Sequence, residues 1–320
     1  MNKRLFHMIG LAISLALPLT SPAQTYPDKP VRMIVPFPAG TATDVGARML
    51  SQKLQEALGQ PFVVENKPGA AGTIGAMEVV RAKPDGYTLL FSSNSAAASN
   101  VALVKSMPYN PATDLSPIAG IGEGVLVLMV RAEHPAKNVQ ELVAYLAQRQ
   151  GKSTAGYGSA STQISIAVLN KRANLDVLAV PYKGIPMAAN DTIGGMVDFT
   201  FVDMGNALSL ANGGRLRALG VTSEKRSPLA PTWPALGETI SGFDVNAWLA
   251  VFGPPSMSPE VVGKLNASIA EIVNAPEMRE KLASTGMQPM VMTAEQLKRF
   301  VPVEIEKWKR LAKDANIAPQ

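Results

Sequence analysis

Short apolar runs alternate with longer amphipathic stretches along nearly the whole chain. The apolar runs have the length and β-branched content of buried strands, whereas the amphipathic stretches repeat apolar residues every three or four positions, as on one face of a helix. The expected strands cover residues 31–35, 62–65, 87–92, 125–130, 153–157, 177–182, 197–202, 216–222 and 245–252. This alternation predicts an α/β fold built on parallel sheets with helices on both faces.

The expected helices have recognisable ends. The first, about residues 42–58, carries Val45, Leu50 and Leu54 on one stripe and ends at Gly59. Thr293 and Gln296 have the spacing of a capping box, which would begin a final amphipathic helix containing Pro302. Further helices are expected near residues 73–83, 138–148, 163–172, 187–193, 206–211 and 259–275, with a restart at Pro276.

The strands divide into two sets, so the chain is expected to form two lobes. The apolar runs 125–130 and 245–252 bracket the middle set and are expected to cross between the lobes. The first lobe would comprise residues 24–124 plus 245–320, and the second residues 125–244. Two α/β lobes joined by crossover strands would leave a cleft between them.

The first 23 residues are expected to be a signal peptide. Lys3 and Arg4 precede an apolar stretch at residues 8–19, and Ser21-Pro22-Ala23 supplies small residues before a cut at Gln24. The apolar stretch is shorter than the roughly 20 residues of a membrane-spanning helix, and the absence of cysteine excludes a lipoprotein anchor. The mature protein is therefore expected in the periplasm, with an extracellular destination as the alternative.

Composition narrows the function further. The formal charge is +5, of which the signal peptide contributes two, and no basic run is interleaved with aromatic residues, so nucleic-acid binding has little support. Without cysteine there is no disulfide framework. With His7 and His134 as the only histidines, a metal site is not expected, and no cofactor motif is evident.

Residues 31–44 carry the most informative pattern. An apolar strand stops at a Pro/Gly turn, and a helix then begins on hydroxyl and acidic residues. Helix N-termini leave backbone N–H groups free and add positive potential, so the amides of Ala39, Gly40 and Thr41 are candidates for binding a carboxylate. Thr41 and Asp44 also fit a helix cap, and Asp44 must then face away from a bound anion or receive a donor group from it.

Polar loops follow two other strands. Ser93, Asn94 and Ser95 follow the strand at 87–92, and Gly158–Thr162, with Ser159, Ser161 and Thr162, follows the strand at 153–157. Such residues are often only turn formers, but ligands of α/β sheets lie at the carboxyl ends of strands. One such loop in each lobe predicts a cleft lined by hydroxyl and N–H groups.

Two charged residues also end strands. Asp203 is either a helix cap or a pocket group, and both interpretations stay open. Lys183 is either a partner for an acidic ligand or a solvated loop lysine.

Catalysis has less support. A serine hydrolase would use Ser159 or Ser161, but neither lies in a Gly-x-Ser-x-Gly elbow. His134, the one imidazole of the mature chain, precedes Pro135 and is expected in a surface loop rather than in a catalytic triad. The protein is therefore expected not to be an enzyme, with an exported hydrolase as the alternative.

An ordered set of motifs across the mature chain resembles the Bug family, the extracytoplasmic receptors of tripartite tricarboxylate transporters. The motifs are Tyr26-Pro27, Val35-Pro36-Phe37-Pro38-Ala39-Gly40, Thr43-Asp44, Val64-Glu65-Asn66-Lys67-Pro68-Gly69-Ala70, Pro84-Asp85-Gly86-Tyr87-Thr88, Val180-Pro181-Tyr182-Lys183-Gly184 and Leu216-Arg217-Ala218-Leu219. The resemblance implies a type II-like periplasmic binding protein, whose two α/β lobes are joined by crossover strands and close on a small organic acid in the ligand cleft between them. It also implies that the protein works with two membrane subunits of a transporter.

The resemblance also implies where the ligand binds. The loops that grip the carboxylate in the family correspond to residues 37–41, including Phe37, and 93–96, and the second-lobe loop corresponds to residues 157–163. Asp203 matches an acidic residue of the family. This chain differs in having no histidine in residues 157–163 and in having Ala96 where many relatives carry a hydroxyl.

The leading hypothesis is a monomeric carboxylate receptor for transport. A receptor that signals through a membrane sensor is an alternative with the same fold, and the exported serine hydrolase is a third hypothesis.

Overall fold

A computed structural model describes residues 26–314 and 316–319. The expected signal peptide, residues 1–23, lies outside the described residues. No helix in the described part of the chain is long and apolar enough to cross a membrane.

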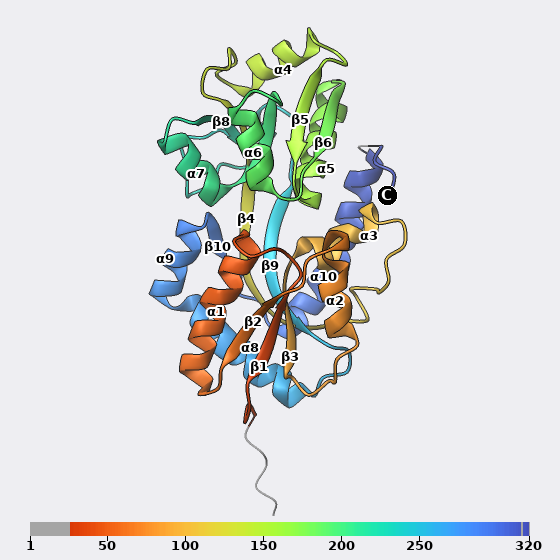
Figure 1. The fold of residues 1–320 in the computed structure, drawn as a ribbon, viewed down its shortest axis with the longest axis vertical. Coiled ribbons are helices and arrows are strands. Elements are labelled where there is room, and N and C mark those ends of the chain that lie inside the picture. The colour runs from red at the N-terminus through yellow and green to blue at the C-terminus, as the bar shows by residue number, and fades with distance from the viewer. Residues whose placement is uncertain (1–25, 315, 320) are drawn as a thin grey trace, which may run out of the picture.

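The chain folds into two α/β lobes, one above the other in Figure 1. The first lobe, lower in the view, contains β1 (Val31–Val35), α1 (Ala42–Leu58), β2 (Phe62–Asn66), α2 (Thr73–Val80), β3 (Thr88–Ser93), a π-helical turn η2 (Ser95–Ser99), α3 (Asn100–Leu103), β9 (Asn246–Gly253), α8 (Pro259–Asn274), α9 (Pro276–Ser284), β10 (Met287–Pro289) and α10 (Ala294–Asp314). The second contains α4 (Val139–Ala147), β5 (Ser153–Tyr157), α5 (Ala160–Ala173), β6 (Val177–Pro181), α6 (Ile185–Ile193), β7 (Phe199–Asp203), α7 (Met204–Asn212) and β8 (Leu216–Val221). The α/β prediction is confirmed.

The long strand β4 (Ser116–Arg131) belongs to both lobes. Its first half pairs with β9 and β10, and its second half pairs with β7 and β8. The strand order is β2-β1-β3-β9-β4-β7-β5-β6. β1 is parallel to β2 and β3, and β5 is parallel to β6 and β7, but every pairing of β4 and β9 is antiparallel. The expectation of purely parallel sheets was therefore wrong where the crossover strands insert.

The sequence pattern located only the second half of β4. The first half contains Gly120, Gly122 and Gly124, which lower strand propensity. Glycine is required here because β10 passes very close: a Cβ on Gly120 would lie 2.4 Å from the carbonyl oxygen of Met290. The close approach of β10 thus explains both the glycines and the missed half-strand.

Thr222 joins the two chain segments that cross between the lobes. Its amide donates to the Leu126 carbonyl at 2.9 Å, and its hydroxyl accepts from the Leu126 amide at 2.9 Å. The same hydroxyl donates to the Val245 carbonyl at 2.7 Å, and the Val245 amide donates to the Thr222 carbonyl at 2.8 Å. Thr222 is fully buried, so it fixes the register of the crossover segments.

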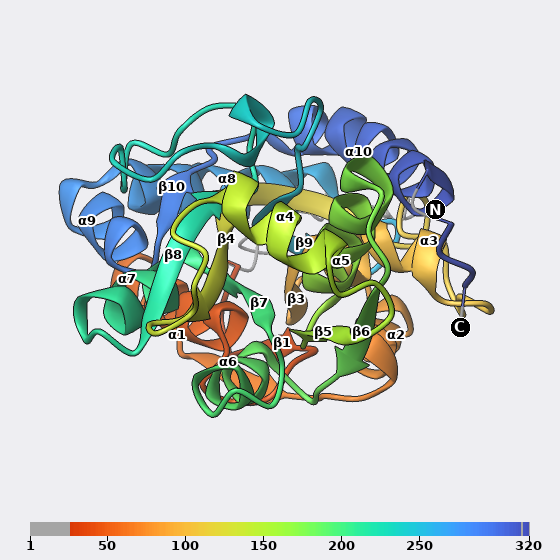
Figure 2. The same cartoon turned by 90° about the horizontal axis from the view of Figure 1, so that it is seen from above.

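Helices cover both faces of the first-lobe sheet (Figure 2). Val31, Met33 and Val35 of β1 pack in a cluster with α1 and α8, whereas Ile34 belongs to a cluster that includes residues of α2 and α10, as the two-residue period of a strand requires. The predicted capping box of α10 is confirmed, since Gln296 N donates to Thr293 Oγ1 and Thr293 N donates to Gln296 Oε1.

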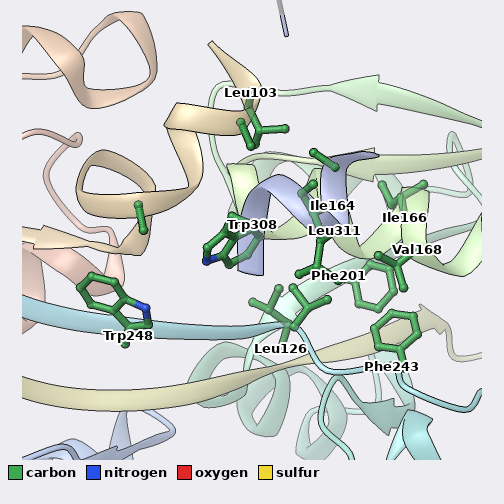
Figure 3. Close-up of a cluster of buried hydrophobic side chains, with 14 of the residues drawn as sticks. Leu103, Leu126, Ile164, Ile166, Val168, Phe201, Phe243, Trp248, Trp308 and Leu311 are labelled. Carbon is green, nitrogen blue, oxygen red and sulfur yellow. The ribbon is translucent and has the colours of Figure 1, made fainter. Parts of the chain in front are cut away.

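One apolar cluster continues from the first lobe into the second (Figure 3). Trp308 of α10 lies in it together with Trp248 of β9 and Ile164 of α5. Both indole nitrogens donate to the same oxygen of Glu304, at 2.8 Å from Trp248 and 3.2 Å from Trp308. The helix α10 therefore packs against both lobes and anchors β9.

Candidate ligand-binding site

A cavity of about 150 Å³ lies between the lobes and is lined by residues of both. The lining includes Phe37, Gly40, Thr41, Ser93, Asn94, Ser95, Ser159, Ser161 and Asp203, all named from the sequence. The two other predicted residues, Ala39 and Thr162, do not line it: Ala39 is exposed, and Thr162 is fully buried.

The N-terminus of α1 forms part of the first-lobe wall. Thr41 is the N-cap, and its hydroxyl accepts from the Asp44 amide at 3.3 Å. Helix geometry leaves the amides of Ala42 and Thr43, both in the wall, without an intrahelical acceptor. The open donors thus lie one to two residues later than the sequence analysis expected.

Asp44 supports this wall from behind. Its carboxylate accepts from the Gly40 amide at 2.9 Å, from Asn66 at 2.9 Å and from Arg48 at 3.1 Å. Burial raises the pKa of Asp44, but the hydrogen bonds from Arg48, Gly40 and Asn66 outweigh it, so the net pKa is lowered. Asp44 is therefore a charged structural anchor turned away from the cavity, as one of the two expected arrangements required.

Ser93, Asn94 and Ser95 complete the first-lobe wall at the start of η2. Asn94 is 1% exposed, and its Nδ2 donates to Ser161 Oγ in the second lobe at 3.1 Å. Ser93 Oγ accepts from the Ser95 amide at 3.3 Å. The segment was expected to be a polar loop, but it begins a helical element whose three alanines are fully buried.

The N-terminus of α5, in the second lobe, forms the cavity wall opposite Ser93, Asn94 and Ser95. Ser159 caps the helix and exchanges hydrogen bonds with Thr162 in a capping box. The helix starts at Ala160, earlier than the predicted residue 163, so Ser161 stands in the first turn and the polar loop is shorter than expected. Thr162 shapes this wall through its bonds to the Gly158 and Ser159 amides without facing the cavity.

Helices α6 and α7 also begin at the cavity. Asp203 accepts from the Asn206 amide at 3.2 Å and so caps α7, and it lines the cavity as well. Lys183, in the loop before α6, lines the cavity beside Gly184 and Ile185. Among the described lining residues, Lys183 and Asp203 are the only ionisable ones.

The lobes also meet at backbone level. A Cβ on Gly286, which precedes β10 and has φ +81°, would lie 2.3 Å from the amide nitrogen of Gly205 in α7. With the Asn94–Ser161 bond, this contact shows that the lobes are closed on each other.

The floor of the cavity was missed by the sequence analysis. It consists of residues from the crossover strands and β10: Gly124, Val125, Leu126, Ala247, Leu249 and Met287. Apolar residues in strands have the same pattern whether they face a core or a cavity, so only the tertiary structure distinguishes them.

The electrostatics of the site come mainly from the backbone. Helices α1, α5, α6 and α7 all direct their N-termini at the cavity, and each contributes a partial positive charge of up to about one half. The side chains of Lys183 and Asp203 cancel in formal charge. The site is thus suited to an anion held by amides and hydroxyls.

Within the described part of the chain, neither the Ser159 nor the Ser161 hydroxyl forms a hydrogen bond with a basic side chain. Ser159 Oγ contacts Thr162, and Ser161 Oγ accepts from Asn94. His134 is not in a surface loop as expected but is buried, 2% exposed, with Nδ1 accepting from the Ala136 amide and its ring packed on Tyr145. It is absent from the cavity lining. No cluster of three acidic or histidine side chains suited to a metal occurs within the described ranges.

Comparisons with known proteins identify the class. The Tripartite tricarboxylate transporter family receptor profile matches residues 46–317. The chain belongs to this family of solute-binding receptors, which the sequence motifs had indicated, and the two-lobed fold agrees.

Individual relatives extend this result. The chain is 35% identical to Protein BugT of Bordetella pertussis over 312 residues, 95% of each chain. Its structure resembles that of R. palustris Rpa4515 with adipate, with a TM-score of 0.88 and 30% identity over 92% of this chain and 100% of the other. It also resembles MatC of Rhodopseudomonas palustris with bound malate, with a TM-score of 0.83 and 28% identity over 89% and 99% of the two chains.

Proposed function

We propose that this protein is an extracytoplasmic receptor that captures a small organic carboxylate between its lobes and delivers it to the membrane subunits of a tripartite tricarboxylate-type transporter. The observation that carries the proposal is the convergence of helix N-termini from both lobes on one cavity. Relatives with the same fold hold adipate and malate, and family membership supports the transporter partnership.

Cleft closure is the proposed mechanism. Amides of α1 and hydroxyls of Ser93 and Ser95 offer donors on one wall, and the first turn of α5 offers donors on the other. A ligand that contacts both walls binds the closed state better than the open state, and this difference in affinity shifts the population toward closure. The transporter then recognises the closed receptor.

A thermal-shift screen of organic acids on the mature protein tests the proposal. A bound acid at a hundred times its Kd should stabilise the protein by about 2.7 kcal/mol, whereas the primary amide of the same acid, which lacks the charge, should have little effect. Isothermal titration calorimetry then gives the Kd. Equal stabilisation by acid and amide would contradict the proposal.

The proposed role is binding without catalysis. The hydroxyls of Ser159 and Ser161 contact Thr162 and Asn94 rather than a base, which supports this part. An ester hydrolysis assay with Ser159→Ala and Ser161→Ala tests it: turnover that either substitution abolishes would indicate the hydrolase instead.

Under the proposal the mature protein begins at Gln24 and acts in the periplasm as a monomer. Its lobes comprise residues 24–124 plus 245–320 and residues 125–244. Terminal sequencing of protein from a periplasmic fraction tests the cleavage site, and light scattering after gel filtration tests the monomer. A first residue other than Gln24, or a dimer, would contradict the corresponding part.

A further inference from the structure

We propose that the cavity selects carboxylates with an apolar body, such as alkyl or aryl acids, over acids that carry hydroxyl groups on the same carbon skeleton. This inference rests on the proposed function and deepens it, because it concerns which carboxylates the site takes. It is carried by the distribution of polar and apolar groups over the three walls of the cavity.

The floor is a continuous apolar surface made by three neighbouring strands. Met287 of β10 and Ala247 of β9 are both register partners of Gly124 in β4, so the three residues form one row across the sheet. Leu249 lies two residues beyond Ala247 along β9 and faces the cavity too, while Trp248 between them points to the opposite face, toward Glu304. The floor therefore presents apolar side chains in register.

The polar groups near the floor are already engaged. Ladder pairing of β4 with β9 and β10 uses their backbone groups, and Thr222 bonds both the amide and the carbonyl of Leu126. The hydroxyl of Thr285, which also lines the cavity, donates to the Leu282 carbonyl at 2.8 Å. A ligand hydroxyl lying over Ala247 and Leu249 would thus leave water without gaining a hydrogen-bond partner from either side chain.

The lateral walls have the opposite character. The first-lobe wall offers the amides of Ala42 and Thr43 and the hydroxyls of Ser93 and Ser95, and the second-lobe wall offers the start of α6. A carboxylate satisfied at these walls positions the rest of its carbon skeleton over Ala247 and Leu249. The geometry thus separates the head group of the ligand from its body.

Calorimetric titrations of matched acids test this selectivity. The probes are three pairs that differ by one hydroxyl: succinate and malate, hexanoate and 6-hydroxyhexanoate, tricarballylate and citrate. For each skeleton that binds, the acid without the hydroxyl should bind about 10- to 100-fold more tightly, the discrimination that an apolar pocket achieves against an added hydroxyl.

Two substitutions in the floor test whether its apolar side chains determine the selectivity. Ala247→Ser adds one hydroxyl to the floor with little change in volume. It should lower the ratio of the two Kd values within each pair of acids. Leu249→Met keeps the floor apolar and should leave the ratio unchanged. Equal or tighter binding of the hydroxylated acids would overturn this inference alone, whereas failure of every carboxylate to bind would overturn the proposed function with it.

Discussion

Asn94 and Ser161, which belong to opposite lobes, are joined by a buried hydrogen bond of 3.1 Å at the wall of the cavity. Both residues stood out in the sequence as separate polar loops, one per lobe, and the structure brings them into direct contact. Because the bond exists only when the lobes are closed, it contributes to the closed state independently of any ligand contact.

Asn94→Ala should weaken ligand binding by destabilising the closed state. A net hydrogen bond is worth about 0.5–1.5 kcal/mol, which corresponds to a loss of affinity of up to about tenfold. Calorimetry on Asn94→Ala, Ser161→Ala and the double variant forms a complete double-mutant cycle. If the two single effects simply add, the bond does not couple the lobes.

Thr222→Val should lower the free energy of unfolding by about 1–3 kcal/mol, because the isosteric methyl leaves the Leu126 amide and the Val245 carbonyl unpaired in a buried position. Thr222→Ser keeps the hydroxyl and serves as the control. Urea unfolding measures both variants. Equal stability of Thr222→Val and the parent would show that the hydroxyl does not hold the crossover segments together.

Gly158 and Gly184 provide a matched pair in the second-lobe wall. A Cβ on Gly158 would lie 2.1 Å from the carbonyl carbon of Gly184, so Gly158→Ala must push apart two segments that line the cavity. A Cβ on Gly184 would meet only Pro186 Cδ at 3.7 Å, and its φ of −172° suits any residue.

We therefore expect Gly158→Ala to lose at least tenfold in ligand affinity or to lower the melting temperature by several degrees, while Gly184→Ala leaves the melting temperature unchanged. Thermal unfolding and calorimetry are measured side by side. Identical behaviour of the two variants would contradict the close approach of these segments.

His134 should make stability depend on pH. Burial lowers its pKa, and the neighbouring charge of Arg131 lowers it further. The folded state therefore resists protonation, whereas the unfolded chain takes up a proton below its ordinary pKa of about 6.5. Stability is full above that pH and is lost as the pH falls below it.

Urea unfolding between pH 7.5 and pH 5 measures this dependence. Below pH 6.5 the parent should lose up to about 1.4 kcal/mol per pH unit more than His134→Phe, which cannot take up that proton. The comparison uses the change in the free energy of unfolding per pH unit, so a loss of stability that is the same at every pH does not affect it. Parallel slopes would show that His134 is protonated in both states alike.

Local signals in the sequence sufficed for much of the fold. Helix caps at Thr41 and Asp203 need only a side-chain oxygen and the next turn of backbone, so they are visible in the sequence. Apolar runs likewise identified most strands. These same caps marked the walls of the cavity, because helices that begin at the carboxyl ends of strands begin at the cleft.

Features that depend on distant contacts were not predictable. The glycine-rich half of β4 has the composition of a loop, and only its contact with β10 explains the glycines. Leu249 and Met287 are apolar like core residues, and only the tertiary structure shows that they line a cavity. His134 reads as a surface residue, but Tyr145 and the Arg217 guanidinium, which donates to the His134 carbonyl, enclose it. Each of these features depends on a contact with a residue that is distant in the sequence.

Glu304 accepts hydrogen bonds from the indoles of Trp248 and Trp308, which are two of the three tryptophans in the sequence. A carboxylate beside an indole alters its emission, and Trp248 lies on a strand whose alternate residues form the floor of the cavity. We therefore expect closure of the lobes on an acid to change the intrinsic tryptophan emission, a signal that needs no attached dye.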